Sequence, residues 1–319
     1  MARRVVSTIA GILLLAVAGA ALAARETPIP GHRVLLTVVA SPFLMPAAPL
    51  ALVVSLWGRR WTLAGVAGCV TALLAALQLP WHLSADSDPN AVRVRVMSIN
   101  MRFGNADPRA LVRIADENAD IVTVQELTPE AVRGLAAAGM ADRFPYQVLD
   151  ARDQAAGVCL YSRYPITDST RVGGYGLRLI NAGIQVDGVG QDTSVVSVHF
   201  AAPWPQPITR WHRDLAAFPE TLTELAAQSG TGPILVGGDF NSTIDMRPFR
   251  QLLTNGYRNA AEQAGAGRTF TYPSNRRFPP IIGIDHVLTR NCTAVSMRTV
   301  EIAGTDHRAL LTTVMVPRG

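Results

Sequence analysis

The chain has 319 residues, of which 49% are hydrophobic, and a formal net charge of +5. All of the excess positive charge comes from the first 81 residues, which contain six arginines and a single acidic residue, Glu26. Residues 82–319 hold 23 arginines and 23 acidic residues and are therefore formally neutral. This balance argues against a broad basic surface for nucleic acid, although a local patch stays open.

Several motif classes are absent. The cysteines Cys69, Cys159 and Cys292 stand among apolar residues, which predicts buried thiols rather than a disulfide framework. Neither CxxC nor HExxH occurs, so no zinc site is expected. No serine lies in a GxSxG elbow, and the glycines near residue 174 lack the GxGxxG spacing of dinucleotide-binding loops.

Residues 1–83 are predicted to form a membrane segment with three transmembrane helices. Residues 5–24, 34–58 and 61–80 carry no charge, and about 20 apolar residues in a helix cross ~30 Å of hydrocarbon. An alternative treats the first run as a cleaved signal peptide, because Ala-Leu-Ala stands shortly before Arg25.

Charge around these runs predicts their orientation. By the positive-inside rule Arg3-Arg4 and Arg59-Arg60 lie inside, although two further arginines lie on the outer loop. The chain then emerges on the extracytoplasmic side of a cell membrane. The polar stretch 84–90 is expected to be a short linker that holds residues 91–319 close to the outer face.

From residue 91 strands and helices alternate. Residues 91–99 alternate apolar and polar, as a half-buried strand does. A helix is expected to begin at Asp107 as N-cap with Pro108 in its first position, and a second to begin at Thr128. Strand 120–126 lies between these two helices.

The later elements continue this pattern. Strands are expected at residues 157–162, 177–186, 193–200, 233–238, 281–288, 293–300 and 309–316, with helices near 208–228 and 246–254. Many strands with few helices between them predict a layered α/β sandwich with two sheets.

Polar residues stand where these strands end. They are Asn100, Glu126, His199, Asp239, Asn241, Asp285, Asp306 and His307. Each alone is explained as a turn residue or a hydrogen-bonded core histidine. Their recurrence at strand ends predicts that they meet in one site.

These residue types favour phosphate chemistry. Oxygen ligands such as Glu126, Asp306 and Asn100 suit Mg²⁺ or Mn²⁺, and a histidine with an aspartate to orient it fits a general base. Donors such as Asn241 and His199 suit the stabilisation of charge on phosphoryl oxygens. Together they predict hydrolysis of a phosphate ester by an activated water.

An ordered set of motifs resembles the endonuclease/exonuclease/phosphatase superfamily. The set consists of "SIN" (98–100), "VQE" (124–126), "LYSRYP" (160–165), "SVHF" (197–200), "GGDFN" (237–241), "IDHVL" (284–288) and "GTDHRAL" (304–310). The resemblance spans about residues 92–317. This group includes deoxyribonucleases, abasic-site endonucleases, inositol polyphosphate 5-phosphatases and neutral sphingomyelinases.

The resemblance implies a four-layered α/β sandwich, with two mixed sheets flanked by helices, and a metal site. Glu126 would be the principal ligand of Mg²⁺ or Mn²⁺, Asn100 would lie beside it, and Asp306 would complete the site. The glycines of "GGDFN" would let backbone and phosphate approach closely.

The resemblance also implies catalytic roles. Asp239 and Asn241 would contact the scissile phosphate and position the nucleophile. His307, oriented by Asp285, would be the general base or a donor to the phosphoryl oxygens. His199 would be a second acid or phosphate contact.

Two loops are expected to choose the substrate. Residues 201–212 and 271–280 combine aromatic residues with arginines, and from them Arg210, Tyr272 and Arg276 are expected to contact it. Proline-stiffened loops with solvated arginines are the alternative.

Three functions remain open. The first is a membrane-tethered, metal-dependent phosphodiesterase or nuclease acting on extracytoplasmic nucleic acid. The second is the same chemistry on a phospholipid or sphingolipid headgroup, which the tether and the neutral domain favour. The third is a catalytically silent receptor or scaffold, against which the intact acidic and histidine positions argue. The pattern indicates no protein partner.

Overall fold

The computed structural model describes residues 1–319, which divide into two compact units. The first unit combines Met1–Pro80 with the short segment Ile244–Arg250. The second unit combines Trp81–Thr243 with Gln251–Gly319 and holds both β-sheets. The residues expected to form a linker, 84–90, belong to this second unit, where Ser84 forms a β-bridge with Ala264.

The first unit is helical. It contains α1 (Ala2–Glu26), α2 (His32–Leu44), α3 (Ala47–Trp57), α4 (Trp61–Gln78) and, in the returning segment, α9 (Arg247–Arg250). The helices Ala2–Glu26 and Trp61–His82, the latter being α4 continued by η1 (Leu79–His82), are long and apolar enough to cross a membrane.

The helix expected over residues 34–58 is broken. The pair α2 and α3 is bent by 51°, with Pro42 inside α2 and Pro46 before α3. Proline lacks the N–H that would continue the helical hydrogen bonds and clashes with the preceding turn. Three uninterrupted helices are therefore not found, and the structure has two candidate spans, or three if the bent pair is one. Cys69 on α4 is also exposed, contrary to the expectation of a buried thiol.

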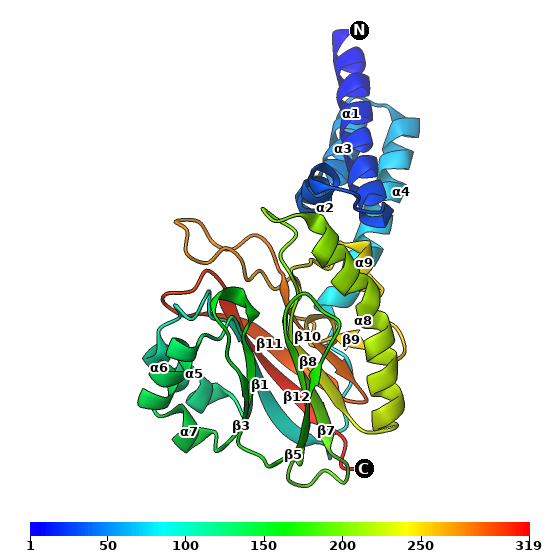
Figure 1. Cartoon of the computed structure of the whole chain (residues 1–319). Helices are drawn as coiled ribbons and strands as arrows, with labels where there is room; N and C mark the ends of the chain where they lie inside the picture. Colours follow the sequence, from blue (N-terminus) through cyan, green and yellow to red (C-terminus); the bar gives the residue numbers. More distant parts are fainter. The chain divides into compact units, whose positions relative to one another are not determined.

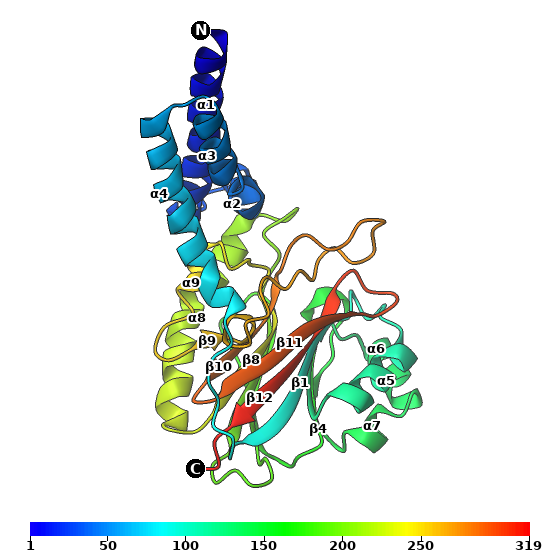
Figure 2. The same cartoon turned by 180° about the vertical axis from the view of Figure 1, so that it is seen from behind.

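The second unit contains two six-stranded mixed sheets (Figures 1 and 2). The first has the order β11 (Thr293–Glu301), β12 (Arg308–Val316), β1 (Val92–Asn100), β2 (Ile121–Gln125), β4 (Val158–Ser162), β3 (Tyr146–Asp150). The second has the order β5 (Ile166–Val172), β6 (Leu179–Ile184), β7 (Thr193–His199), β8 (Ile234–Asp239), β10 (Asp285–Arg290), β9 (Arg258–Asn259). The pairs β1–β2 and β7–β8 are parallel, and the other pairs are antiparallel.

Helices cover the outer faces of the sheets, as the four-layered expectation requires. The first sheet is covered by α5 (Pro108–Asn118), α6 (Pro129–Ala137) and α7 (Met140–Arg143), and the second by α8 (Ile208–Ser229) (Figure 1). Two shorter elements, η2 (Gln154–Ala156) and α10 (Ala260–Gln263), complete the unit. Along β1, Val94 and Val96 join the core between the sheets, whereas Met97 and Ile99 join the core beneath the helices.

Two expected elements are shorter than their sequence patterns. The strand expected at 281–288 begins only at Asp285, because Ile282 instead bridges to Tyr272. The helix expected near 246–254 is the single turn Arg247–Arg250.

The glycines of "GGDFN" serve packing between strands. A Cβ on Gly238 would lie 1.9 Å from the carbonyl oxygen of Val198, and one on Gly237 would lie 2.8 Å from the hydroxyl of Thr123 on the facing sheet. Both positions thus exclude a side chain because β8 approaches its neighbours closely. The expected close approach of backbone and phosphate stays a prediction.

Candidate active site

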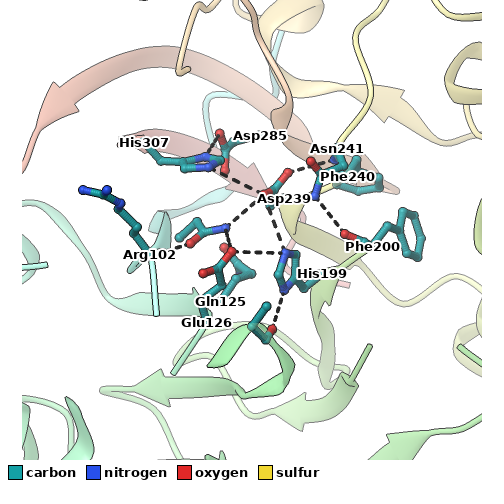
Figure 3. Close-up of polar contacts among 12 residues, drawn as sticks. Arg102, Gln125, Glu126, His199, Phe200, Asp239, Phe240, Asn241, Asp285 and His307 are labelled. Carbon is teal, nitrogen blue, oxygen red and sulfur yellow. Dashed lines mark hydrogen bonds and ion pairs between the residues drawn. The ribbon is translucent and has the colours of Figure 1, made fainter. Parts of the chain in front are cut away.

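The central strands of both sheets end at one place. On the parallel pair β7–β8, His199 lies opposite Asp239, and on the antiparallel pair β8–β10, Asp239 lies opposite Asp285. From the first sheet, Asn100 lies opposite Gln125, which directly precedes Glu126. The polar strand ends therefore gather into one cluster (Figure 3).

One amide links carboxylates from the two sheets. The Nδ2 atom of Asn100 donates to Glu126 Oε1 and to Asp239 Oδ2, both at 3.0 Å. The backbone N–H of Phe103 donates to the other oxygen of Glu126 at 2.7 Å. The backbone N–H of Arg102 donates to Asn100 Oδ1, which fixes the amide in this orientation.

Strained backbone is concentrated at this cluster. Eight residues other than glycine have positive φ, and Arg102, Phe103, Glu126 and Asn241 are four of them, with φ between 48° and 57°. A positive φ costs conformational energy in a residue with a Cβ, and such residues are often found at functional sites. The turn at Glu126 places its carboxylate beside Asn100, and that at Asn241 lets its amide donate to the carbonyl of Phe200 at 2.8 Å.

His307 is held by Asp285. Its Nδ1 lies 2.8 Å from Asp285 Oδ2, and both side chains are buried. Burial alone would lower the pKa of the imidazole, but Asp285, followed by Asp239 and Asp306, raises it to about 10. The Nε2 atom then carries a proton and lies 3.8 Å from Asp239 Oδ2.

Asp239 lies between the two histidines. Its carboxylate is almost fully buried, and burial followed by the charge of Asp285 raises its pKa to about 8. His199 Nδ1 lies 2.9 Å from the carbonyl of Ala155 and donates to it, while Nε2 lies 3.7 Å from both Glu126 and Asp239. Burial chiefly lowers the pKa of His199, so a neutral ring presents a bare nitrogen to these carboxylates.

The charge of the cluster fits a cation. Asp239, Asp285 and His307 offer ligand atoms that all lie within 4.8 Å of one another, and Asp285 Oδ1 is buried without a hydrogen-bond partner. Glu126 and Asp306 add two carboxylates. Oxygen donors in this number are those that Mg²⁺ and Mn²⁺ prefer, so the residues fit a hard divalent ion.

Two of the three expected metal ligands contact each other directly, and the third lies apart from them. Asn100 and Glu126 are in direct contact, as described. Asp306 lies at the side of the cluster, 4.0 Å from His307 Nε2 and 3.6 Å from the guanidinium of Arg102. The ligand atoms that lie closest together belong to residues that were expected to be catalytic. The three expected metal ligands lie beside them.

The three expected substrate contacts differ in position, and Arg276 is exposed on the loop that follows Tyr272. Tyr272 lies against the site, with its ring centroid 5.1 Å from that of His307. Burial, followed by the charge of Asp306, raises the pKa of its hydroxyl, which Arg276 partly offsets. Arg210 is exposed on the first turn of α8, where its stem packs near Gly176, and no hydrogen bond joins it to the cluster.

The sequence analysis did not assign a role to three residues that hold the backbone of the site. Trp211 falls in the stretch 201–212 that was expected to choose the substrate, but it is fully buried, and its indole N–H donates to the carbonyl of Asn241 at 3.1 Å and to Ser242 Oγ at 3.0 Å. His286 Nε2 donates to the carbonyl of Ser242 at 2.8 Å. The hydroxyl of Thr305 donates to the carbonyl of Asn100 at 2.7 Å. His286 and Thr305 had a sequence signal, since each stands next to an aspartate in the motifs "IDHVL" and "GTDHRAL".

Comparisons with known proteins agree with this geometry. Solved structures of similar fold include an endonuclease/exonuclease/phosphatase from Bacteroides vulgatus, with 20% identity, TM-score 0.56, and 70% of this chain and 99% of that chain covered. Truncated TDP2 from Caenorhabditis elegans has 14% identity and TM-score 0.56, covering 70% and 98%. SmcL has 17% identity and TM-score 0.52, covering 70% and 99%.

No curated protein matches the chain. The model of the endonuclease/exonuclease/phosphatase family, however, matches residues 97–307, which is well over half of the sequence. This match begins on β1 and ends at His307, so it encloses every polar strand end of the cluster. The chain belongs to the endonuclease/exonuclease/phosphatase family.

Proposed function

We propose that this chain is a membrane-anchored, divalent-metal-dependent phosphodiesterase. The observation that carries the proposal is the buried arrangement of Asp285, His307 and Asp239, which Asn100 joins to Glu126 across the two sheets. Members of this family are generally phosphoester hydrolases, and the apolar helices α1 and α4 support anchoring.

The side chains divide the work between proton transfer and charge stabilisation. Asp285 keeps His307 oriented and charged, so Nε2–H can donate to a phosphoryl oxygen. Asp239 lies beside that N–H, and its ionised form, which predominates above its pKa of about 8, can accept a proton from the attacking water. Asn241, held through its backbone by Trp211, helps to position the phosphate.

Glu126, with Asn100 beside it and Asp306 at the side, would hold a divalent cation. When bound, such an ion neutralises charge on the phosphoryl group. The strained turn and the two hydrogen bonds at Glu126 keep its carboxylate in place for this role. The bound ion would also offset the negative charge of the carboxylates that the cluster brings together.

The test uses the full chain in lipid nanodiscs with bis-p-nitrophenyl phosphate, Mg²⁺ or Mn²⁺, and a matched EDTA control. His307→Gln and Glu126→Gln should each lower turnover by at least about 10²-fold. Asp285→Asn should also lower kcat, because an amide orients the ring without stabilising its charge. Glu130→Gln, an exposed site on α6, is the control and should leave turnover unchanged.

Metal-independent turnover, or turnover that survives in both Gln variants of the cluster, would contradict the proposal. Folding of each variant is checked by circular dichroism. A folded His307→Gln variant without activity separates loss of chemistry from loss of structure.

A further inference from the structure

Exposed apolar side chains gather around the candidate site. Beyond residue 92 five large ones are exposed: Phe103 (52%), Tyr146 (39%), Trp204 (56%), Phe278 (50%) and Ile281 (42%). All except Tyr146 stand on three loops, residues 101–107, 200–207 and 264–284, each of which leads from or into a strand of the site. We call Phe103, Trp204, Phe278 and Ile281 the apolar rim.

These three loops converge on the site. The backbone of Phe103 donates to Glu126, and the carbonyl of Phe200 accepts from Asn241. The backbone N–H of Ser274 donates to the carbonyl of Asp306 at 2.8 Å. Figure 1 shows the loops of the second unit projecting beyond the same end of its two sheets. The apolar rim therefore borders the place where a phosphodiester would bind.

Trp81, the first residue of the second unit, contacts one of these loops. Trp81, in the last turn of the helix Trp61–His82, packs against the core between the sheets. Its carbonyl accepts from the backbone N–H of Gly267 at 2.7 Å. Gly267 belongs to the loop that goes on to carry Phe278 and Ile281. Trp81 therefore contacts the loop that carries two residues of the apolar rim.

We propose that the apolar rim is an interfacial docking surface for a lipid bilayer and that the substrate is the headgroup phosphodiester of a membrane phospholipid. This inference rests on the proposed function and names its substrate class. Exposed aliphatic and aromatic side chains insert favourably at the boundary between headgroups and acyl chains. A single loop presents Arg276 and Arg277 next to Phe278, which suits anionic headgroups.

The rim fits lipid better than nucleic acid. A platform for single-stranded nucleic acid combines aromatic faces with a long basic groove. Here Ile281 has no aromatic face, and residues 82–319 are formally neutral. Attachment to a membrane-length helix would also keep the surface within reach of a bilayer.

The test compares two substrates in one preparation of the full chain, reconstituted in nanodiscs of phosphatidylcholine and phosphatidylglycerol with Mg²⁺ or Mn²⁺. The double variant Phe278→Ser/Ile281→Ser should lower hydrolysis of the disc lipids by at least about tenfold, because two apolar side chains no longer enter the interface. Cleavage of soluble bis-p-nitrophenyl phosphate, which needs no bilayer, should stay within about twofold. Tyr146→Ser, an exposed apolar position on the edge strand β3, should change neither rate.

A second measurement follows the rim directly. Brominated lipids should quench tryptophan fluorescence more in the wild type than in Trp204→Phe, because the rim tryptophan is then absent. Equal quenching in both would overturn the inference.

The outcomes separate the two proposals. If the wild type cleaves bis-p-nitrophenyl phosphate but no lipid, or if the double variant keeps its lipid rate, the docking inference fails and the proposed function stands. If the wild type leaves lipid intact and the double variant loses cleavage of an oligonucleotide, the rim serves nucleic acid and the inference is wrong. If the wild type cleaves neither bis-p-nitrophenyl phosphate nor lipid with metal present, the proposed function itself fails.

Discussion

At the scale of single residues, the site depends on side chains that are buried and therefore sensitive to their partners. Sequence reasoning names all eight polar strand ends that the structure brings into one chain of contacts. It could do so because a turn residue explains one polar strand end but not the recurrence of such residues at many strand ends, within an ordered set of motifs. Trp211 could not be found in this way, because an indole near a proline-rich loop has the same sequence pattern whether it is exposed or buried.

His286 predicts a dependence of stability on pH. Burial lowers its pKa to about 4, below the usual 6.5, so folding disfavours its protonated form. Its contribution is complete above pH 6.5 and is lost as the pH falls towards 4, because only the unfolded chain then takes up the proton. The full loss is roughly 3 kcal/mol.

Denaturant unfolding of the full chain in detergent at pH 7 and pH 5 measures this effect. The decrease in unfolding free energy between the two pH values should be smaller in His286→Gln by about 2 kcal/mol. The variant can be less stable at both pH values without affecting the comparison, since only the difference counts. An equal decrease in both proteins would show that His286 titrates normally in the folded state.

At the scale of elements, local signals predict helix starts better than sheet edges. Asp107 and Thr128 accept hydrogen bonds from the third residue after each, as their N-cap positions predict. The strands β3 and β5 were missed. Both are edge strands, last in one sheet and first in the other, and residues 167–171 of β5 are all exposed. An edge strand exposed on both faces lacks the apolar alternation that marks a half-buried strand.

The helix α8 carries a prediction about positioning. Trp211 donates from its first turn to the carbonyl of Asn241, so Trp211→Phe removes that donor while filling most of the volume. We expect kcat to fall about tenfold with KM nearly unchanged, since Asn241 loses its support but the phosphate contacts remain. Stability should fall by about 1–3 kcal/mol, because buried oxygens are left unsatisfied.

Trp204→Phe is the matched control, since Trp204 is 56% exposed. The two variants are compared by steady-state kinetics on bis-p-nitrophenyl phosphate and by thermal unfolding. Equal kinetics in both would show that α8 does not position Asn241.

At the scale of the whole molecule, charge is separated along the chain. The net +5 lies entirely within the first 81 residues, whereas residues 82–319 are formally neutral but concentrate four carboxylates at one site. Composition predicts the first fact directly. The second depends on strand register across two sheets, which no local pattern encodes. The sequence therefore predicts a cation site, whereas the structure shows which ligand atoms lie closest together.

A cation that binds only the folded cluster should raise the thermal midpoint of the full chain in detergent. At a concentration 100 times its Kd, Mg²⁺ or Mn²⁺ would stabilise the fold by about 2.7 kcal/mol, which corresponds to roughly 5–10 °C for a unit of this size. Glu126→Gln keeps the size of the side chain but removes its charge and one of the two acceptors that serve Asn100 and Phe103, and should lose most of that shift. Glu130→Gln, exposed on α6, should keep it. A thermal midpoint that neither metal nor EDTA changes would mean that protons, not a cation, balance the four carboxylates. Asp239 and Asp285 would then be a buried pair that shares a proton rather than part of a metal site.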